Sequence, residues 1–247
     1  MRTDPAAREK VLVFAPHPDD EVIACGGAIA AKAAAGAHVV IVFATDGSRS
    51  HSAVLGIDAD PSPAELAVVR RKEAESAAKA LGADPGEVVW LGHTDTLLSA
   101  SSDAFRAQVL RLLAEHRDVT EVYLPHDVRE LNADHRLTGE GVIACLAELG
   151  LAPRLRKYVV WDEDTEAAFE FTNRAAPHRE PSPTERLVSV DITPWTARKL
   201  DALEEHRTQV TLYSRAQTRT VVPEPFLARL RAKRTEEFWI DEPGEDA

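Results

Sequence analysis

The strongest constraint on the fold is an alternation of short apolar runs with Ala-rich, charge-bearing stretches of helical length. The runs are rich in β-branched residues and almost continuously apolar, which is typical of strands buried on both faces. We predict strands at 11–15, 39–44, 88–91, 121–124 and 158–161, and helices at 21–35, 64–81, 103–116 and 135–149. This alternation predicts an α/β fold, a Rossmann-like three-layer sandwich with a mostly parallel sheet.

The last third of the chain has a different character. Residues 162–186 contain acids and prolines, including the letters HREPSPTE, and predict a loop that leaves the core. We then expect a strand at 188–192, a helix from Pro194 to about His206, and a short helix and final strand within FLARLRAKRTEEFWI. Proline suits the first turn of a helix. We therefore expect a single domain over 1–247, with a core at about 8–161 and a C-terminal, substrate-shaping lobe at about 162–247.

The composition narrows the choice of partners and compartment. With 41 acidic and 29 basic residues the net charge is −12, which argues against non-specific binding to nucleic acid. The sequence has neither an apolar run of about 18 residues for a membrane span nor the apolar core of a signal peptide. Cys25 and Cys145 are too few for a disulfide framework, so we expect reduced thiols in a cytoplasmic protein. A homo-oligomer is compatible with this composition.

The stretch VLVFAPHPDDEVIACGG, residues 11–27, places a histidine and three acids directly after a buried strand. In a doubly wound sheet, ligands bind outside the carboxyl ends of the strands. His17 and Asp20 offer an imidazole and a carboxylate across a tight turn, and both groups bind an ion such as Zn²⁺. Asp19 would face a bound water and take its proton. The alternative is that these acids only cap the following helix, but His17 and Pro18 favour the metal site.

A catalytic zinc ion usually has three protein ligands, so one more must come from elsewhere. The best candidate is His135, in YLPHDVRELNADHRLTGEG after the fourth predicted strand, and His126 is its rival because it lies nearer the strand end. The other histidines are scattered, and we expect them to be surface or solvated residues: His38, His51, His93, His116, His178 and His206.

The pairing of PHPDDE after a first strand with a distant DHR at the start of a helix resembles the PIG-L/LmbE-like zinc-dependent N-deacetylases. Further matching pieces follow in the family's order: ATDG (44–47), RRKEAESAAKALG (70–82), LGHTD (91–95) and KLDALEEHRTQ (199–209). The resemblance implies a zinc ion, or ferrous iron in cells, held by His17, Asp20 and His135. It also implies that Asp19 is the general base that activates the metal-bound water.

The resemblance further implies that Arg70 and Asp95 contact sugar hydroxyls or an anionic group of the substrate. For Arg70 the alternative is a structural ion pair with Glu73, three residues further along the same helix. For Asp95 the alternative is a loop-capping role.

Asn132 departs from the family pattern. Many relatives read HPDH where this chain reads NADH at 132–135, and their first histidine stabilises the oxyanion or protonates the leaving amine. The Asn132 amide can donate a hydrogen bond to an oxyanion, but it cannot supply a proton. The acid could be Asp19 itself, His126 or Asp127.

We therefore expect a hydrolase that removes an N-acetyl group from a small, hydrophilic amino sugar or sugar conjugate. Phe169, Phe171 and Arg174 suit contact with a sugar ring. One alternative is an amidase for a non-acetyl amide such as a thiol conjugate, and another is a non-catalytic metal-binding or ligand-binding relative, against which the intact Asp19 argues. A nucleotide-binding oxidoreductase is disfavoured because CGGAIAAKAAAG lacks the G-x-G-x-x-G pattern.

Overall fold

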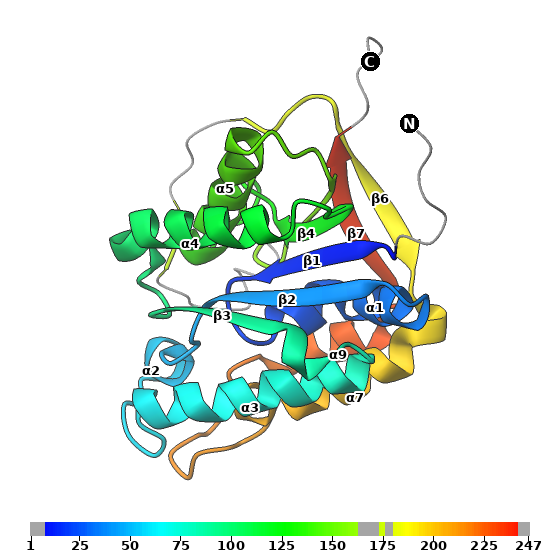
Figure 1. Ribbon diagram of the computed structural model, residues 1–247. Coiled ribbons are helices and arrows are strands. Elements are labelled where there is room, and N and C mark those ends of the chain that lie inside the picture. Colours follow the sequence, from blue (N-terminus) through cyan, green and yellow to red (C-terminus); the bar gives the residue numbers. More distant parts are fainter. Residues whose placement is uncertain (1–7, 163–172, 176–179, 242–247) are drawn as a thin grey trace.

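A seven-stranded sheet forms the centre of the molecule, with the strand order β3-β2-β1-β4-β5-β7-β6 (Figure 1). The computed structural model describes residues 8–162, 173–175 and 180–241. The first five strands run parallel, whereas β7 is antiparallel to both β5 and β6. The strands are β1 (Lys10–Ala15), β2 (His38–Thr45), β3 (Val88–His93), β4 (Glu121–Pro125), β5 (Arg154–Tyr158), β6 (Glu185–Asp191) and β7 (Thr235–Asp241). The predicted α/β sandwich with a mostly parallel sheet is confirmed.

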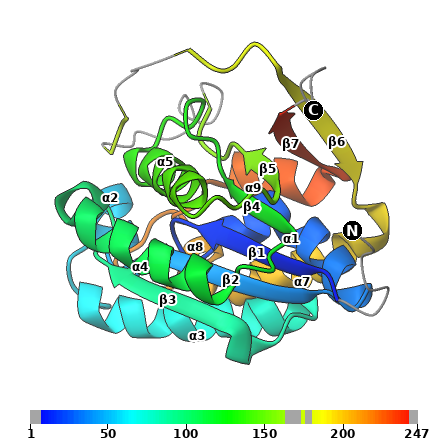
Figure 2. The same cartoon turned by 45° about the horizontal axis from the view of Figure 1, so that its top comes forward.

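Helices cover both faces of this sheet, and the alternation of side chains along β1 shows how the two cores form. Val11, Val13 and Ala15 pack toward one layer of helices, whereas Leu12 and Phe14 pack toward the other. The first layer contains α1 (Asp20–Ala34), α3 (Pro63–Leu81), α7 (Thr196–Glu205) and α9 (Glu224–Ala232); the second contains α4 (Ser102–Glu115) and α5 (Ala133–Glu148). Figures 1 and 2 show the two layers on opposite sides of the strands.

The strand order defines where a ligand site can form. β1 lies between β2 and β4, so the chain runs outward from β1 to β3 and then returns to the other side of β1. The crevice beyond the carboxyl ends of β1 and β4 is the switch point at which open α/β sheets bind ligands. The PHPDDE turn leaves β1 there, and the segment that leads to His135 leaves β4.

Most predicted elements agree with the structure to within one or two residues, but the fifth strand was placed too late. β5 spans Arg154–Tyr158, not 158–161, because it pairs with β4 from Arg154 opposite Glu121. Its charges are compensated: Arg156 Nε donates to Glu121 Oε1 at 2.7 Å. The apolar residues that suggested a strand lie beyond it, where Val160 N–H donates to the Glu130 carboxylate at 2.6 Å.

Three smaller differences concern short or irregular segments. The predicted loop 162–186 ends earlier, since β6 already begins at Glu185. The short helices α2 (Ser50–Leu55) and α8 (Arg207–Val210) were not predicted, because neither is long enough to show a helical period. The predicted helix from Pro194 is split into a 3₁₀ turn, Thr193–Trp195, followed by α7.

The C-terminal third attaches to the core through a buried ion pair. Glu236 on β7 accepts hydrogen bonds from the α1 N–H groups of Gly27 and Ala28 at 2.7 and 2.8 Å. Lys199 on α7 donates to Glu236 at 2.6 Å and to the carbonyl of Ile23 at 2.9 Å. Glu236 and Lys199 thus join β7 and α7 to one turn of α1, the helix that begins at Asp20.

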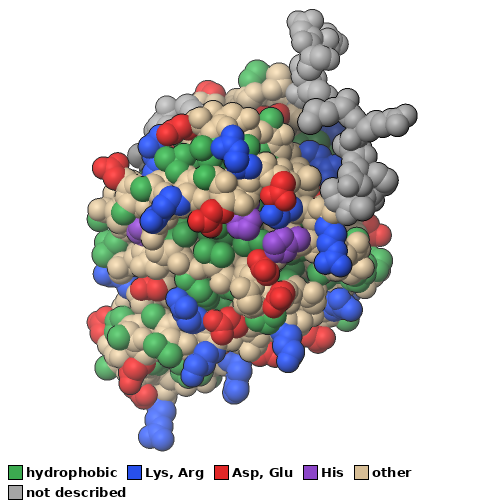
Figure 3. Space-filling model, in the orientation of Figure 1, with side chains coloured by type: hydrophobic (Ala, Val, Ile, Leu, Met, Phe, Trp, Pro, Cys, Tyr) green, Lys and Arg blue, Asp and Glu red, His purple; other side chains and the backbone are tan. Residues whose placement is uncertain are grey.

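Two further features of the described residues concern the surface charge and the helices. On the face in Figure 3, outside the grey atoms, basic and acidic side chains are interspersed and form no extended basic patch. Among the helices that the structure describes, none has both the length and the apolar character needed to cross a bilayer.

We predict that Glu236→Ala destabilises the protein strongly, because it leaves the buried Lys199 ammonium without its partner. The expected loss in the free energy of unfolding is about 3–5 kcal/mol, the scale for a broken buried pair. Urea titration followed by circular dichroism measures it. The control is Glu237→Ala, which removes an exposed pair with Lys233 and should cost less than about 1 kcal/mol. Equal losses in the two variants would contradict the structural role of Glu236.

Candidate active site

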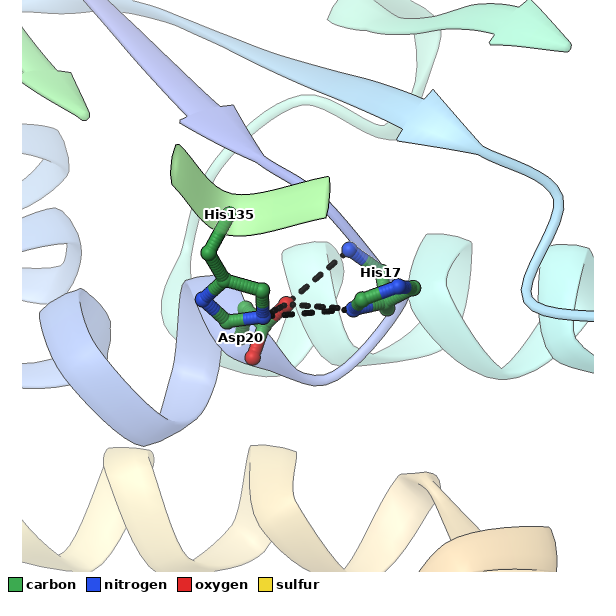
Figure 4. Close-up of side chains that lie close together, drawn as sticks. All are labelled: His17, Asp20 and His135. Atoms are coloured by element: carbon green, nitrogen blue, oxygen red, sulfur yellow. Dashed lines mark hydrogen bonds and ion pairs between the residues drawn. The ribbon is translucent and has the colours of Figure 1, made fainter. Parts of the chain in front are cut away.

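Three side chains meet at the switch point with their ligand atoms facing one another (Figure 4). His17 follows β1, Asp20 begins α1 and His135 lies in the first turn of α5. His17 Nδ1, His135 Nε2 and Asp20 Oδ2 are separated by 3.1–3.3 Å. A tetrahedral ion with bonds of about 2.0–2.1 Å separates its ligand atoms by about 3.3–3.4 Å. The structure therefore brings the three predicted ligands together at the spacing of one face of such a tetrahedron.

Carboxylates orient both histidines by contacting the ring nitrogen that does not face the cluster. His17 Nε2 lies 3.3 Å from both Asp95 Oδ1 and Asp134 Oδ2, and His135 Nδ1 lies 3.1 Å from Glu130 Oε1. Metal-binding histidines usually donate their second N–H to such a group, which fixes the ring and raises its basicity. These contacts leave His17 Nδ1 and His135 Nε2 to bind a metal.

The charge balance at this cluster favours a cation. Burial alone would lower the pKa of His135, but the Asp20 and Glu130 carboxylates outweigh it and raise the pKa to about 9. Burial likewise opposes protonation of His17, yet Asp95, Asp134 and Asp20 raise its pKa well above the usual value. Since buried carboxylates need compensation, the cluster attracts positive charge, which protons or a divalent metal can supply. Donor types, spacing and charge all fit a zinc-type ion.

Asp19 lies beside the cluster in an unusual backbone conformation, with φ 143° and ψ −27°. Such a conformation costs on the order of 1–3 kcal/mol for a residue with a side chain, so surrounding contacts must enforce it. The Asp19 N–H donates to Glu21 Oε2 at 2.9 Å, and the Asp19 carboxylate lies 3.4 Å from Arg70 Nη2. Burial raises the pKa of the Asp19 carboxyl to about 7, against the opposing charge of Arg70. In this geometry Asp19 is not one of the three clustered ligands.

Arg70 supports the turn that carries Asp19. It is 1% exposed, and its guanidinium donates to the carbonyls of Pro18 and Gly47, in the latter case at 2.9 Å. Gly47 has φ 64°, and a Cβ there would collide with the Arg70 guanidinium. The alternative ion pair with Glu73 is not formed, because Glu73 accepts from Thr208 instead. A direct contact of Arg70 with substrate remains a prediction.

Asp95 and Asn132 both have structural partners at the site. Asp95 accepts from the Arg49 N–H at 3.1 Å, as the loop-capping alternative required, but it also contacts His17. Asn132 is the N-cap of α5: its Oδ1 accepts from Asp134 N–H at 2.9 Å and from His135 N–H at 3.4 Å. Asn132 also lines the pocket, and with Oδ1 engaged its amide NH₂ group is the part left to donate to a substrate oxygen.

A pocket opens over these residues, with a polar floor and a mainly apolar wall. His17, Asp19, Asp20 and Asn132 form part of the floor. Val221, Val222 and Phe226 of the C-terminal third contribute to the wall, together with Ile23, Val160 and Trp161. Phe169 and Phe171 lie outside the described residues. The exposed Arg174 does not line this pocket; its backbone pairs with that of Asn132, and the neighbouring Asn173 lines the pocket.

His126 does not belong to the cluster of His17, Asp20 and His135 but to a separate group with Asp127 and Glu185. Its Nδ1 accepts from the Val128 N–H at 3.1 Å, and its Nε2 lies 3.2 Å from Glu185 on β6. Glu185 is in turn bound by Lys157 Nζ at 2.5 Å. Neither His126 nor Asp127 lines the pocket.

The expectation that the scattered histidines are surface residues was wrong for three of them. His51, His93 and His206 are buried, and hydrogen bonds compensate for the burial of each. His51 contacts the Thr208 carbonyl at 2.9 Å, His93 contacts Gln108 at 2.6 Å, and His206 contacts Glu21 at 2.8 Å. Such long-range partners leave no local pattern in the sequence.

Sequence reasoning missed the roles of Glu130, Asp134, Glu21 and His206. Asp134 was visible within the DHR motif, and His206 lay within KLDALEEHRTQ, so both stood in quoted motifs without an assigned contact. The latter motif joins the C-terminal third to the site: His206 contacts Glu21 and Gln209 contacts Ser50.

Comparison with known proteins agrees with this geometry. The family profile described as PIG-L, GlcNAc-PI de-N-acetylase, matches residues 12–146, which is more than half of the chain and includes all three clustered ligands. The chain belongs to the PIG-L family.

Individual relatives of this PIG-L family chain are deacetylases. A probable N-acetyl-alpha-D-glucosaminyl L-malate deacetylase 2 of Bacillus cereus is 25% identical over 229 residues, covering 93% of this chain and 96% of the relative. The 1D-myo-inositol 2-acetamido-2-deoxy-alpha-D-glucopyranoside deacetylase of Actinosynnema mirum is 31% identical over 235 residues, covering 84% and 83%. The structure of N,N'-diacetylchitobiose deacetylase from Pyrococcus horikoshii aligns with a TM-score of 0.66 and 26% identity, covering 94% of this chain and 84% of that one.

We predict that the purified protein binds about one divalent metal ion per chain, and that His135→Ala abolishes this binding while the fold survives. The reason is that three protein ligands are the usual complement of a catalytic zinc ion. Metal content is measured by inductively coupled plasma mass spectrometry, and folding by circular dichroism. His126→Ala is the control and should retain the metal. Full metal content in His135→Ala would contradict the assignment.

Proposed function

We propose that this protein is a metal-dependent N-deacetylase that hydrolyses the N-acetyl group of an amino sugar or sugar conjugate. The observation that carries the proposal is the position of Asp19: a buried carboxylate that lines a pocket beside a cluster of two histidines and one carboxylate. A purely structural metal site has no use for such a base. The deacetylase activities of the relatives, which act on N-acetylglucosamine-containing compounds by their names, support the same reaction class.

The residues divide the chemistry as follows. His17, Asp20 and His135 would hold the metal, for which zinc is our proposal, with ferrous iron as the alternative. When bound, the metal would polarise the acyl carbonyl and lower the pKa of the attacking water. Asp19 accepts the proton of that water. The Asn132 amide donates a hydrogen bond to the carbonyl oxygen as it gains negative charge.

The leaving amine must gain a proton as the C–N bond breaks. Asn132 has no proton to give, and neither His126 nor Asp127 lines the pocket. Asp19 does line it, so we propose that Asp19 returns to the amine the proton that it took from water. The products are then acetic acid and a free amine, which become acetate and an ammonium group by proton exchange in water, and the base is regenerated in the carboxylate form.

The pocket wall supports an amino-sugar substrate. Trp161 supplies an aromatic ring, and Ser50, Asn173 and Gln209 supply polar groups that can bond sugar hydroxyls. We further propose that the predicted C-terminal lobe shapes substrate choice, since Val222 and Phe226 lie in this wall. Arg70 and Asp95 are proposed to contact substrate in addition to the structural contacts that they make.

Acetate release from a panel of N-acetylated compounds tests the proposed function. The panel contains N-acetylglucosamine, its α-glycosides with charged and uncharged aglycones, N,N'-diacetylchitobiose, and non-sugar N-acetyl amines of similar size. We expect metal-dependent acetate release from one or more of the sugars and none from the non-sugar amines. Turnover of the non-sugar amines alone would contradict the substrate class, and inactivity of the metal-loaded protein on the whole panel would contradict the reaction.

We predict that Asp19→Ala binds metal normally but loses at least about two orders of magnitude in kcat, the lower end of the scale for a lost general base. Steady-state kinetics on the best substrate of the panel and metal analysis of the same preparation give the two quantities. The control is Asp118→Ala, which removes an exposed carboxylate paired with Lys10. Loss of metal from Asp19→Ala would mean that Asp19 is itself a ligand.

A further inference from the structure

The backbone that presents Asp19 is held at both ends of one peptide unit. The Pro18 carbonyl accepts from the Arg70 guanidinium, and the Asp19 N–H donates to Glu21 Oε2 at 2.9 Å. The positively charged Arg70 guanidinium thus binds the carbonyl of the Pro18–Asp19 peptide, and the negatively charged Glu21 carboxylate binds its N–H. These two hydrogen bonds account for the positive φ of Asp19, because they leave the plane of the Pro18–Asp19 peptide little freedom to rotate.

Glu21 depends on a second residue for its own orientation. Its side chain is fully buried, and its other oxygen, Oε1, is bound by His206 Nε2 at 2.8 Å. His206 is also fully buried and lies between the end of α7 and the start of α8, far from Glu21 in the sequence. When a carboxylate is buried, each of its oxygens needs a hydrogen-bond donor to replace the water that it loses. His206 supplies it on one oxygen, so that Glu21 can direct the other toward the Asp19 N–H.

We infer that His206 is a positioning residue for the reaction: through Glu21 it fixes the Asp19 backbone, and thereby the direction of the Asp19 carboxylate. His206 does not line the pocket, so it acts on the base and touches no substrate. The chain of contacts runs from His206 to Glu21 to the Asp19 N–H. The inference rests on the proposed role of Asp19 as the base, and it adds a residue of the C-terminal third to the machinery of that step.

Three variants separate positioning from stability. His206→Ala removes the donor to Glu21, whereas His206→Gln places an amide N–H where Nε2 was. Leu203→Ala is the matched control: Leu203 is buried in the hydrophobic core on α7, the helix that ends directly before His206, and its side chain makes none of these polar contacts. All three are assayed for kcat, KM, metal content and thermal midpoint.

We expect His206→Ala to lower kcat by about 10- to 100-fold, the range found when a group that orients a metal ligand is removed and adopted here for a group that orients the base, while KM and metal content stay unchanged. His206→Gln should recover most of that loss, and Leu203→Ala should lower the thermal midpoint without lowering kcat. In the Asp19→Ala background, His206→Ala should change kcat by less than about twofold, because both substitutions then remove the same contribution.

An equal loss of kcat in Leu203→Ala, or an undiminished effect of His206→Ala when Asp19 is already alanine, would overturn the inference. Crystal structures of the variants provide a readout that does not depend on activity. The φ of Asp19 should relax away from its positive value in His206→Ala and keep it in Leu203→Ala, and an unchanged φ in His206→Ala would overturn the inference. If the wild-type protein hydrolyses nothing in the panel, the proposed function fails, but this comparison still tests the positioning role.

Discussion

An excess of buried carboxylates at the switch point of the sheet is the constraint on which the rest of this structure depends. Asp19, Asp20, Asp95, Asp134 and Glu130 are each at most 8% exposed. Negative charge persists inside a protein only where cations or hydrogen-bond donors compensate for the lost water. Arg70 lies beside Asp19, but at the centre of the group the only basic side chains among the described residues are those of His17 and His135. That deficit is the physical reason why this end of the sheet suits a cation, as proposed above.

Backbone N–H groups from neighbouring loops provide the remaining compensation, and they also assemble the site. Asp134 accepts from Thr96 and Leu98 after β3, and Glu130 accepts from Val160 and Trp161 after β5. Each carboxylate therefore orients a histidine and joins two loops at the same time. The geometry of the cluster is set by the loops after β1, β3, β4 and β5 acting together, on strands whose register fixes their ends.

The sequence was sufficient to predict the features that depend on residues close together along the chain. Alternating apolar and helical segments predicted the sandwich, and the PHPDDE and DHR motifs predicted which three side chains would meet. It was insufficient for contacts between distant segments. Nothing local tells that His206 reaches Glu21, or that Glu130 accepts from the Val160 N–H, because each partner is chosen by tertiary packing. The misplaced fifth strand has the same origin: residues 159–161 are apolar, yet Val160 and Trp161 donate their N–H groups to a buried carboxylate instead of extending the sheet.

The close approach of Arg70 to Gly47 has a consequence for how this chain can vary over evolutionary time. A side chain at position 47 would occupy the space of the guanidinium. It could be accommodated only if position 70 became shorter and Pro18, whose Cδ lies 2.8 Å from the added Cβ, also shifted. The Pro18 carbonyl would then lose its buried donor. Neither position can therefore change alone without disturbing the turn that bears Asp19. Positions 47 and 70 are therefore coupled: during evolution a substitution at one of them is expected to accompany a substitution at the other.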